Sequence, residues 1–171
     1  MVHTDPTSRP ETMPARGGLG SGLGSLLWCW LPSVLWMAVI FCLSTNAGAP
    51  RNTSRIIGPL LRWIYPAISD QAVRNVLLVT RKSAHVTEYA VLGVLLWRAR
   101  RRPVPGERRP WRWREAIFAL GVAALFAASD EWHQSFVPSR EGRPLDVLID
   151  SAGAALGLLA CWRVGRWRKR W

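Results

Sequence analysis

The chain has 171 residues, 49% of them hydrophobic, with eleven tryptophans and a formal net charge of +12. A soluble domain of this length seldom combines so much apolar surface with so many tryptophans, whereas a membrane protein places aromatic anchors and basic loops at the ends of apolar spans. The basic residues gather at the ends of apolar runs and form no stripe along a helix, so we expect no nucleic-acid partner.

The amino-terminal region divides into a tail and a first apolar run. Residues 1–24 are rich in Pro, Gly, Ser and Thr and predict a disordered cytoplasmic tail. Residues 25–44 hold no charge and are long enough to cross a bilayer core of ~30 Å. A cleaved signal peptide is the alternative, because residues 47–49 (AGA) resemble a cleavage site. The length of the run and Pro50 directly after that site favour an uncleaved helix.

The rest of the chain supplies three further spans and one segment of mixed character. Residues 51–80 are of mixed character: residues 55–68 contain apolar side chains, arginines and two prolines, which suits a segment lying in the membrane interface, and residues 71–80 lead into the second span. The second span ends at Trp97, the third covers residues 115–135 and the fourth residues 145–164. The sequence therefore predicts an all-α membrane protein: a four-helix transmembrane bundle over residues 25–164, with an interfacial segment between helices one and two. Residues 165–171 are predicted to form a basic cytoplasmic tail.

The distribution of Lys and Arg predicts the orientation. The two tails and the loop 98–114 together hold 15 of these residues, and the segments on the other side hold 8. Because cytoplasmic loops carry the excess of Lys and Arg, both termini are predicted to be cytoplasmic. We therefore expect a multi-pass protein of the cell membrane whose principal partner is the lipid bilayer. The composition is compatible with an oligomer.

Polar side chains occur inside three of the four predicted spans. At ~1.5 Å per residue from the inner boundary, they all fall in the outer half of the bilayer. Residues three or four apart share a helix face, and the fourth span places its carboxylates on the same face as a GxxxG pair, which permits close helix packing. The predicted polar cluster consists of Lys82, His85, Glu88, Tyr89, Asp130, Glu131, Gln134, Arg140, Arg143, Asp146 and Asp150.

Two interpretations of this cluster stay open. The basic residues could simply neutralise the carboxylates, which would make the cluster a set of structural ion pairs. The cluster could instead line a watery functional pocket that opens outward, because charges inside a membrane are costly and survive where they pair or face water. Asp146 and Asp150 lie one turn apart and repel each other, so the pair needs a shared proton or a basic partner. No HExxH or CxxC motif is present, and we expect neither a metal nor a cofactor.

Three stretches resemble the VanZ-like family: RKSAHVTEYAVLGVLLW, SDEWHQSFVPSREGRPLDVLIDSAGAALG and, more weakly, VIFCLSTNAGAP. The resemblance implies a small multi-span bacterial membrane protein of a family named for a member associated with tolerance of the glycopeptide teicoplanin. It also implies that nine of the cluster residues, all except Arg143 and Asp150, are the family's motif positions. Asp150 stands where the resemblance implies Asn.

Three functions agree with these features. The first is a cell-envelope accessory or binding protein whose polar pocket holds the head group of a lipid-linked or peptidoglycan-related ligand, with a link to glycopeptide tolerance. The second is a membrane-embedded enzyme that uses His85 or Glu88 as an acid or base. The third is a small proton-coupled transporter. No nucleophile motif is present, so whether the protein is an enzyme stays open and no catalytic residue is assigned.

Overall fold

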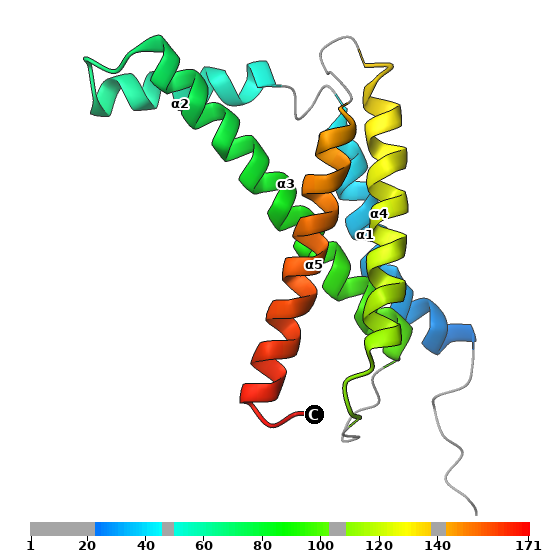
Figure 1. The fold of residues 1–171 in the computed structure, drawn as a ribbon. Helices are drawn as coiled ribbons and strands as arrows, with labels where there is room; N and C mark the ends of the chain where they lie inside the picture. Colours follow the sequence, from blue (N-terminus) through cyan, green and yellow to red (C-terminus); the bar gives the residue numbers. More distant parts are fainter. Residues whose placement is uncertain (1–22, 46–49, 103–108, 138–142) are drawn as a thin grey trace, which may run out of the picture.

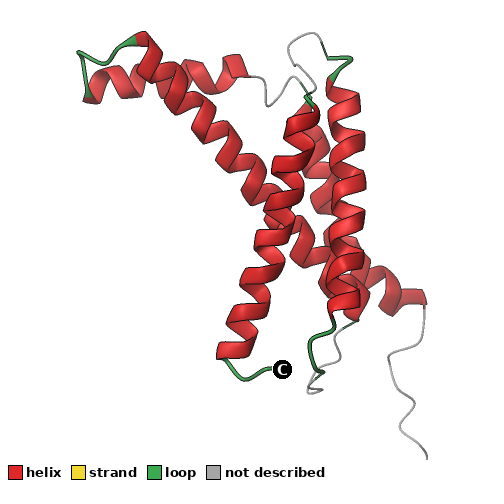
Figure 2. Cartoon of the chain, viewed as in Figure 1, coloured by secondary structure: helices red, strands yellow, loops and turns green. Residues whose placement is uncertain are grey.

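The computed structural model describes residues 23–45, 50–102, 109–137 and 143–171. Within these ranges the chain forms helices and no strand (Figures 1 and 2), which confirms the all-α prediction for this part of the protein. The helices are α1 (Leu23–Ser44), α2 (Pro50–Ile64), α3 (Asp70–Arg101), α4 (Trp113–Gln134) and α5 (Pro144–Trp167). The predicted disordered tail falls almost wholly on residues 1–22, which lie outside the described residues.

Two of these helices are long enough and apolar enough to cross a membrane. They are residues Leu26–Ser44, within α1, and Pro144–Trp167, which is α5. Both match predicted spans to within three residues at each end. The helices α3 and α4 coincide with the other two predicted spans, but charged residues interrupt their apolar runs.

The mixed segment 51–80 forms α2, a turn and the first part of α3, so residues 71–80 lead into the second span as predicted, and the predicted interfacial stretch 55–68 covers most of α2 and the turn. Helix α2 ends at Ile64, and α3 begins at Asp70 and continues without interruption to Arg101. The Ser69 side chain accepts a hydrogen bond from the Ala72 backbone N–H (3.2 Å), which caps the start of α3. Residues 70–80 therefore belong to the same helix as the second predicted span. Figure 1 shows that this end of α3 leans away from the bundle and carries α2 with it.

Helices α3 and α5 run parallel and touch through their backbones. A Cβ added to Gly153 of α5 would lie 2.6 Å from the Val86 carbonyl oxygen of α3, and one added to Gly157 would overlap the backbone of Ala90. Gly153 lies against Val86, and Gly157, four residues later, lies against Ala90, which is also four residues later. The two helices therefore run in the same direction where they cross. The GxxxG pair thus does what its spacing predicts, because only glycine lets two helices approach this closely.

Helices α1 and α4 complete the bundle around this pair. Helix α4 buries alanines at intervals of three or four residues, and its buried face ends in polar side chains. The fully buried alanines are Ala119, Ala123 and Ala127. Helix α1 packs against α3 and α4: the Trp36 indole N–H donates to the Glu88 carbonyl oxygen (2.9 Å) and Ser44 reaches α4. These contacts make α1 part of the fold.

The opposite end of the bundle is closed by tryptophans and arginines. The rings of Trp97 and Trp111 stack with centroids 4.7 Å apart, and Trp171 packs on both. The Arg101 guanidinium lies over Trp97 (5.1 Å) and Trp171 (5.3 Å), a cation–π arrangement. The Trp171 indole also donates to the Trp162 carbonyl oxygen (3.2 Å). The last residue of the chain is therefore tied back to the helix ends.

The glycine contact yields a matched pair of variants. Gly153→Ala forces a methyl group against the α3 backbone and should lower stability by about 1–3 kcal/mol, the usual cost of overpacking. Gly121→Ala makes the same change on α4, where nothing lies within 4 Å of the added Cβ, and should leave stability unchanged or slightly higher. The midpoint of thermal unfolding in detergent compares the two. Equal midpoints would contradict the close packing.

Candidate functional site

Helices α3 and α5 bring two basic side chains of the predicted cluster against its two stacked carboxylates. Lys82 forms a short ion pair with Asp146, and His85 Nδ1 lies 3.4 Å from Asp150 Oδ1, one turn deeper. The Lys82 and Asp146 side chains are 27% and 7% exposed, and those of His85 and Asp150 are 12% and 0% exposed. Each of the two carboxylates therefore faces its own basic group. The basic partner expected for Asp146 and Asp150 is Lys82, which pairs with Asp146.

A second set of contacts joins α4 to α1. Asp130 Oδ2 accepts hydrogen bonds from the Ser44 hydroxyl (2.6 Å) and from the Gln134 amide (2.9 Å). All three side chains are buried, with at most 3% exposure. Ser44 was not among the predicted site residues, although it lies in the weakest of the three family-like stretches. Ser44 is the last residue of an apolar helix. This position is the one feature of the neighbouring sequence that suggests a buried partner for its hydroxyl.

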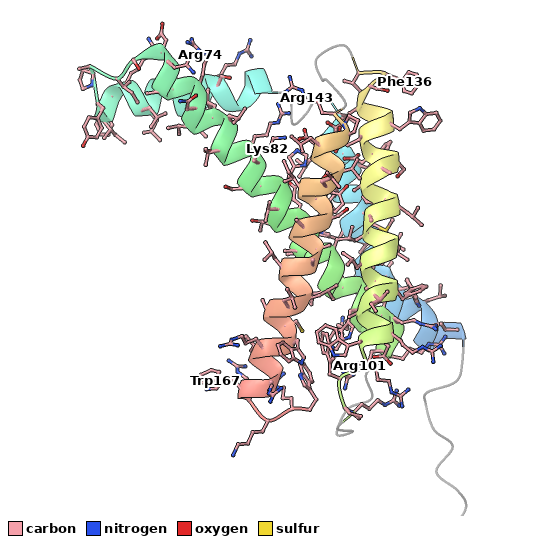
Figure 3. All side chains as sticks on the ribbon, viewed as in Figure 1. Arg74, Lys82, Arg101, Phe136, Arg143 and Trp167 are labelled. Carbon is pink, nitrogen blue, oxygen red and sulfur yellow. The ribbon has the colours of Figure 1, made fainter. Side chains whose placement is uncertain are left out.

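Glu131 connects the end of α4 to the start of α5. Its Oε2 accepts a hydrogen bond from the Arg143 backbone N–H (2.9 Å), and its side chain is buried. The Arg143 side chain is exposed. Lys82 and Arg143 both lie toward the end of the bundle where α4 ends and α5 begins (Figure 3). The remaining predicted basic residue, Arg140, lies outside the described residues.

Tyr89 belongs to the buried core of the same region. Its side chain is fully buried, and its hydroxyl forms no hydrogen bond within the described structure. Its ring packs near that of Phe126 on α4, with centroids 6.3 Å apart. Acidic side chains of α3, α4 and α5, namely Glu88, Asp130, Glu131 and Asp150, contribute to the electrostatic potential at its phenol.

His133 behaves differently from the cluster residues on α4. Its ring packs on Phe41 of α1 with centroids 4.4 Å apart. The ten cluster residues that the structure describes thus come from the middle of α3, the end of α4 and the start of α5, and α1 adds Ser44 to them.

Several buried acceptor atoms in the cluster have no hydrogen-bond partner among the described residues. They are Asp130 Oδ1, Glu131 Oε1 and both carboxylate oxygens of Asp150. A buried polar atom without a partner is uncommon in a native structure, and of these four oxygens Asp150 Oδ1 faces His85 Nδ1 at 3.4 Å. Across the described ranges, no three His, Cys, Asp or Glu side chains are arranged to hold a metal ion. The arrangement therefore offers acceptors for a hydrogen-bond donor.

The ion pair between Lys82 and Asp146 can be tested against an exposed pair. Lys82→Met should cost about 1–3 kcal/mol because it leaves a buried carboxylate without its partner. The double variant Lys82→Met, Asp146→Leu should recover most of that loss. Arg62→Met breaks the Arg62–Asp70 pair, whose side chains are 56% and 71% exposed, and should change stability by less than about 1 kcal/mol. Thermal unfolding in detergent measures all three, and no recovery in the double variant would contradict the account.

Residues 29–165 match the VanZ/LLP1 family. The match covers most of the chain and includes every residue of the polar cluster, so the protein belongs to the VanZ/LLP1 family. Neither the curated proteins nor the solved structures include a match to the chain.

Proposed function

We propose that this VanZ/LLP1 protein crosses the cell membrane four times, through α1, α3, α4 and α5, with both termini in the cytoplasm. The helices expose large apolar side chains to their surroundings, which suits contact with lipid. They include Leu35 on α1, Leu125 on α4 and Leu148 and Leu156 on α5, each more than half exposed. The excess of Lys and Arg in the tails and in the loop after α3 supports the orientation.

Helix α3 needs a separate argument, because it is longer than a span. Its 32 residues extend over about 48 Å at ~1.5 Å per residue, against a bilayer core of ~30 Å. The first third of the helix therefore projects beyond the core on the outer side. Helix α2 joins it there and exposes Ile56, Leu60 and Trp63 beside its arginines. This composition supports an α2 that lies in the outer interface.

Cysteine labelling of intact cells tests the topology. The three native cysteines, Cys29, Cys42 and Cys161, are first replaced. Ala67→Cys, in the exposed turn between α2 and α3, should then react with a membrane-impermeant reagent. Lys169→Cys, near the carboxyl terminus, should react only after the cells are permeabilised. The reverse pattern would overturn the orientation, and labelling of both sites in intact cells would overturn the number of spans.

We infer that the protein is a cell-envelope accessory or binding protein whose polar cluster receives the head group of a lipid-linked or peptidoglycan-related ligand from the outer side. The observation that carries this inference is the cluster itself: α4 and α5 bury four carboxylates between them, more than Lys82 neutralises. A structural bundle could be built from apolar and small residues without that desolvation cost. Family membership supports a role in tolerance of glycopeptide antibiotics.

An acid–base enzyme is the second candidate, and the His85–Asp150 contact is the observation that favours it. A buried carboxylate beside one ring nitrogen of a histidine orients the imidazole as a proton acceptor. A proton-coupled transporter would use the same buried carboxylates as proton carriers. An enzyme would turn over a substrate, and a transporter would carry protons across the membrane. Measuring either activity in purified protein reconstituted into vesicles would distinguish these two functions from binding alone.

Near-isosteric variants separate a functional cluster from a structural one. Asp130→Asn, Asp146→Asn and His85→Gln keep the side-chain shape and should leave the protein level within about twofold of wild type. Each should abolish the effect of the protein on susceptibility to glycopeptides or other envelope antibiotics. Arg168→Gln, at the opposite end of the bundle, should preserve both readouts. If the cluster variants lose the protein itself and keep activity in proportion to its level, the cluster is structural.

A further inference from the structure

A groove lies on the surface of α5 at the end of the bundle opposite the polar cluster. It has a volume of about 660 Å³. The residues that line it are Trp162, Arg163, Val164, Arg166 and Trp167. Figure 3 shows Trp167 at this end, with Lys82 and Arg143 toward the other. The groove is therefore separate from the candidate site described above.

The groove faces away from the contact between α5 and α3. Gly157 of α5 lies against Ala90 of α3, and Arg166 follows Gly157 by nine residues. At ~100° per residue, nine residues turn a helix by about two and a half revolutions, so Gly157 and Arg166 point to opposite sides of α5. The groove therefore opens on the side of α5 that faces the surroundings of the α3–α5 pair.

The two arginines of the groove carry charge that no acidic side chain neutralises within the described residues. Arg163 and Arg166 are exposed, and neither forms an ion pair there. The Arg166 guanidinium lies over the Trp162 ring, 5.7 Å from its centroid. Between residues 151 and 171 the sequence has no Asp or Glu. The groove therefore attracts an anion, and a guanidinium binds a phosphate through two parallel N–H donors.

Apolar side chains continue the same face of α5 beyond the groove. Leu156, Leu159, Arg163 and Arg166 follow one another at intervals of three, four and three residues, the spacing that places side chains on one face of a helix. Leu156 and Leu159 are 57% and 47% exposed. The face thus passes from exposed leucines to exposed arginines within about 15 Å, at ~1.5 Å per residue. A soluble anion would contact only the arginines, whereas an amphiphile with an anionic head group matches both parts of the face.

We propose that this face of α5 binds an anionic phospholipid, with the phosphate between Arg163 and Arg166 in the groove and the acyl chains along Leu159 and Leu156. The two tryptophans of the groove flank the arginines, as aromatic rings do at the level of lipid head groups. In the proposed topology this end of α5 lies at the cytoplasmic surface, where anionic lipids attract basic segments next to a membrane span. The site is distinct from the polar cluster and does not depend on the ligand proposed for it.

Thermal unfolding of the full-length protein in detergent tests the proposal. Phosphatidylglycerol supplies one anionic phosphodiester, and phosphatidylcholine with the same acyl chains is its neutral counterpart. Phosphatidylglycerol should raise the unfolding midpoint at a concentration about tenfold lower than phosphatidylcholine, because the arginines distinguish a net negative head group from a neutral one. Inorganic phosphate at the same concentrations should leave the midpoint unchanged, because it has no acyl chains.

Paired variants assign the lipid to the groove. The double variant Arg163→Gln, Arg166→Gln should abolish the tenfold preference for phosphatidylglycerol. The double variant Arg168→Gln, Arg170→Gln is the matched control, because it removes the same two charges from exposed positions at the same end of the protein, outside the groove. This control should keep the preference of the wild type.

A second measurement does not depend on unfolding. The number of phosphatidylglycerol molecules that the purified protein retains can be counted by mass spectrometry. The groove variant should retain at least one molecule fewer than the wild type, and the matched control should retain the same number. This count answers the question even where a variant is less stable than the wild type.

A preference for phosphatidylglycerol that the groove variant loses and the matched control keeps supports the proposal. Equal shifts of the midpoint by the two lipids would overturn it. Equal shifts by phosphatidylglycerol and inorganic phosphate would also overturn it, and would indicate a site for a soluble anion. If both double variants lose the preference equally, the lipid responds to the general charge of this end of the protein, and the groove is not its site.

Discussion

The backbone contact between α3 and α5 is the constraint on which the rest of the structure depends. Gly153 and Gly157 bring α5 against Val86 and Ala90, which sets the two helices parallel and fixes their register. The same register places the carboxylates one and two turns earlier on α5 opposite Lys82 and His85. A larger residue at either glycine would separate the helices and leave buried charges without partners. The close packing of the glycines and the pairing of the charges in this bundle therefore depend on the same helix register.

The two ends of the bundle handle charge in opposite ways. At the end where α3 ends, arginines lie on the faces of tryptophans that are buried (Trp97) or half-buried (Trp162 and Trp171), a cation–π arrangement. At the end where α5 begins, carboxylates are buried in the protein beside few basic groups. The first arrangement is typical of helix ends at a membrane surface. The second carries a desolvation cost, and this asymmetry supports the proposal of a binding site at that end.

Much of this organisation could be predicted from the sequence because helical periodicity is a local property. Residues three or four apart share a face, so the alignment of Lys82 and His85, and of Asp146 and Asp150, followed from spacing alone. The GxxxG pair predicted close packing but not the partner helix or its direction. Contacts that a single side chain makes between two helices could not be predicted. The hydrogen bond from Ser44 to Asp130 joins residues 86 positions apart, and no periodic pattern in the sequence marks this contact. The turn at residues 65–69 was also missed, because the apolar content of segment 51–80 hid the Ser69 cap that begins α3.

The central claim is that α3 and α5 lie parallel in the register that joins Lys82 to Asp146. Cross-linking of cysteine pairs in a background without Cys29, Cys42 and Cys161 tests it most directly. Lys82→Cys with Asp146→Cys should be joined by a short bifunctional thiol reagent in native membranes, and Lys82→Cys with Val164→Cys, at the far end of α5, should not. A link between positions 82 and 164 and none between 82 and 146 would mean that the helices run antiparallel, and the shared polar site would not exist.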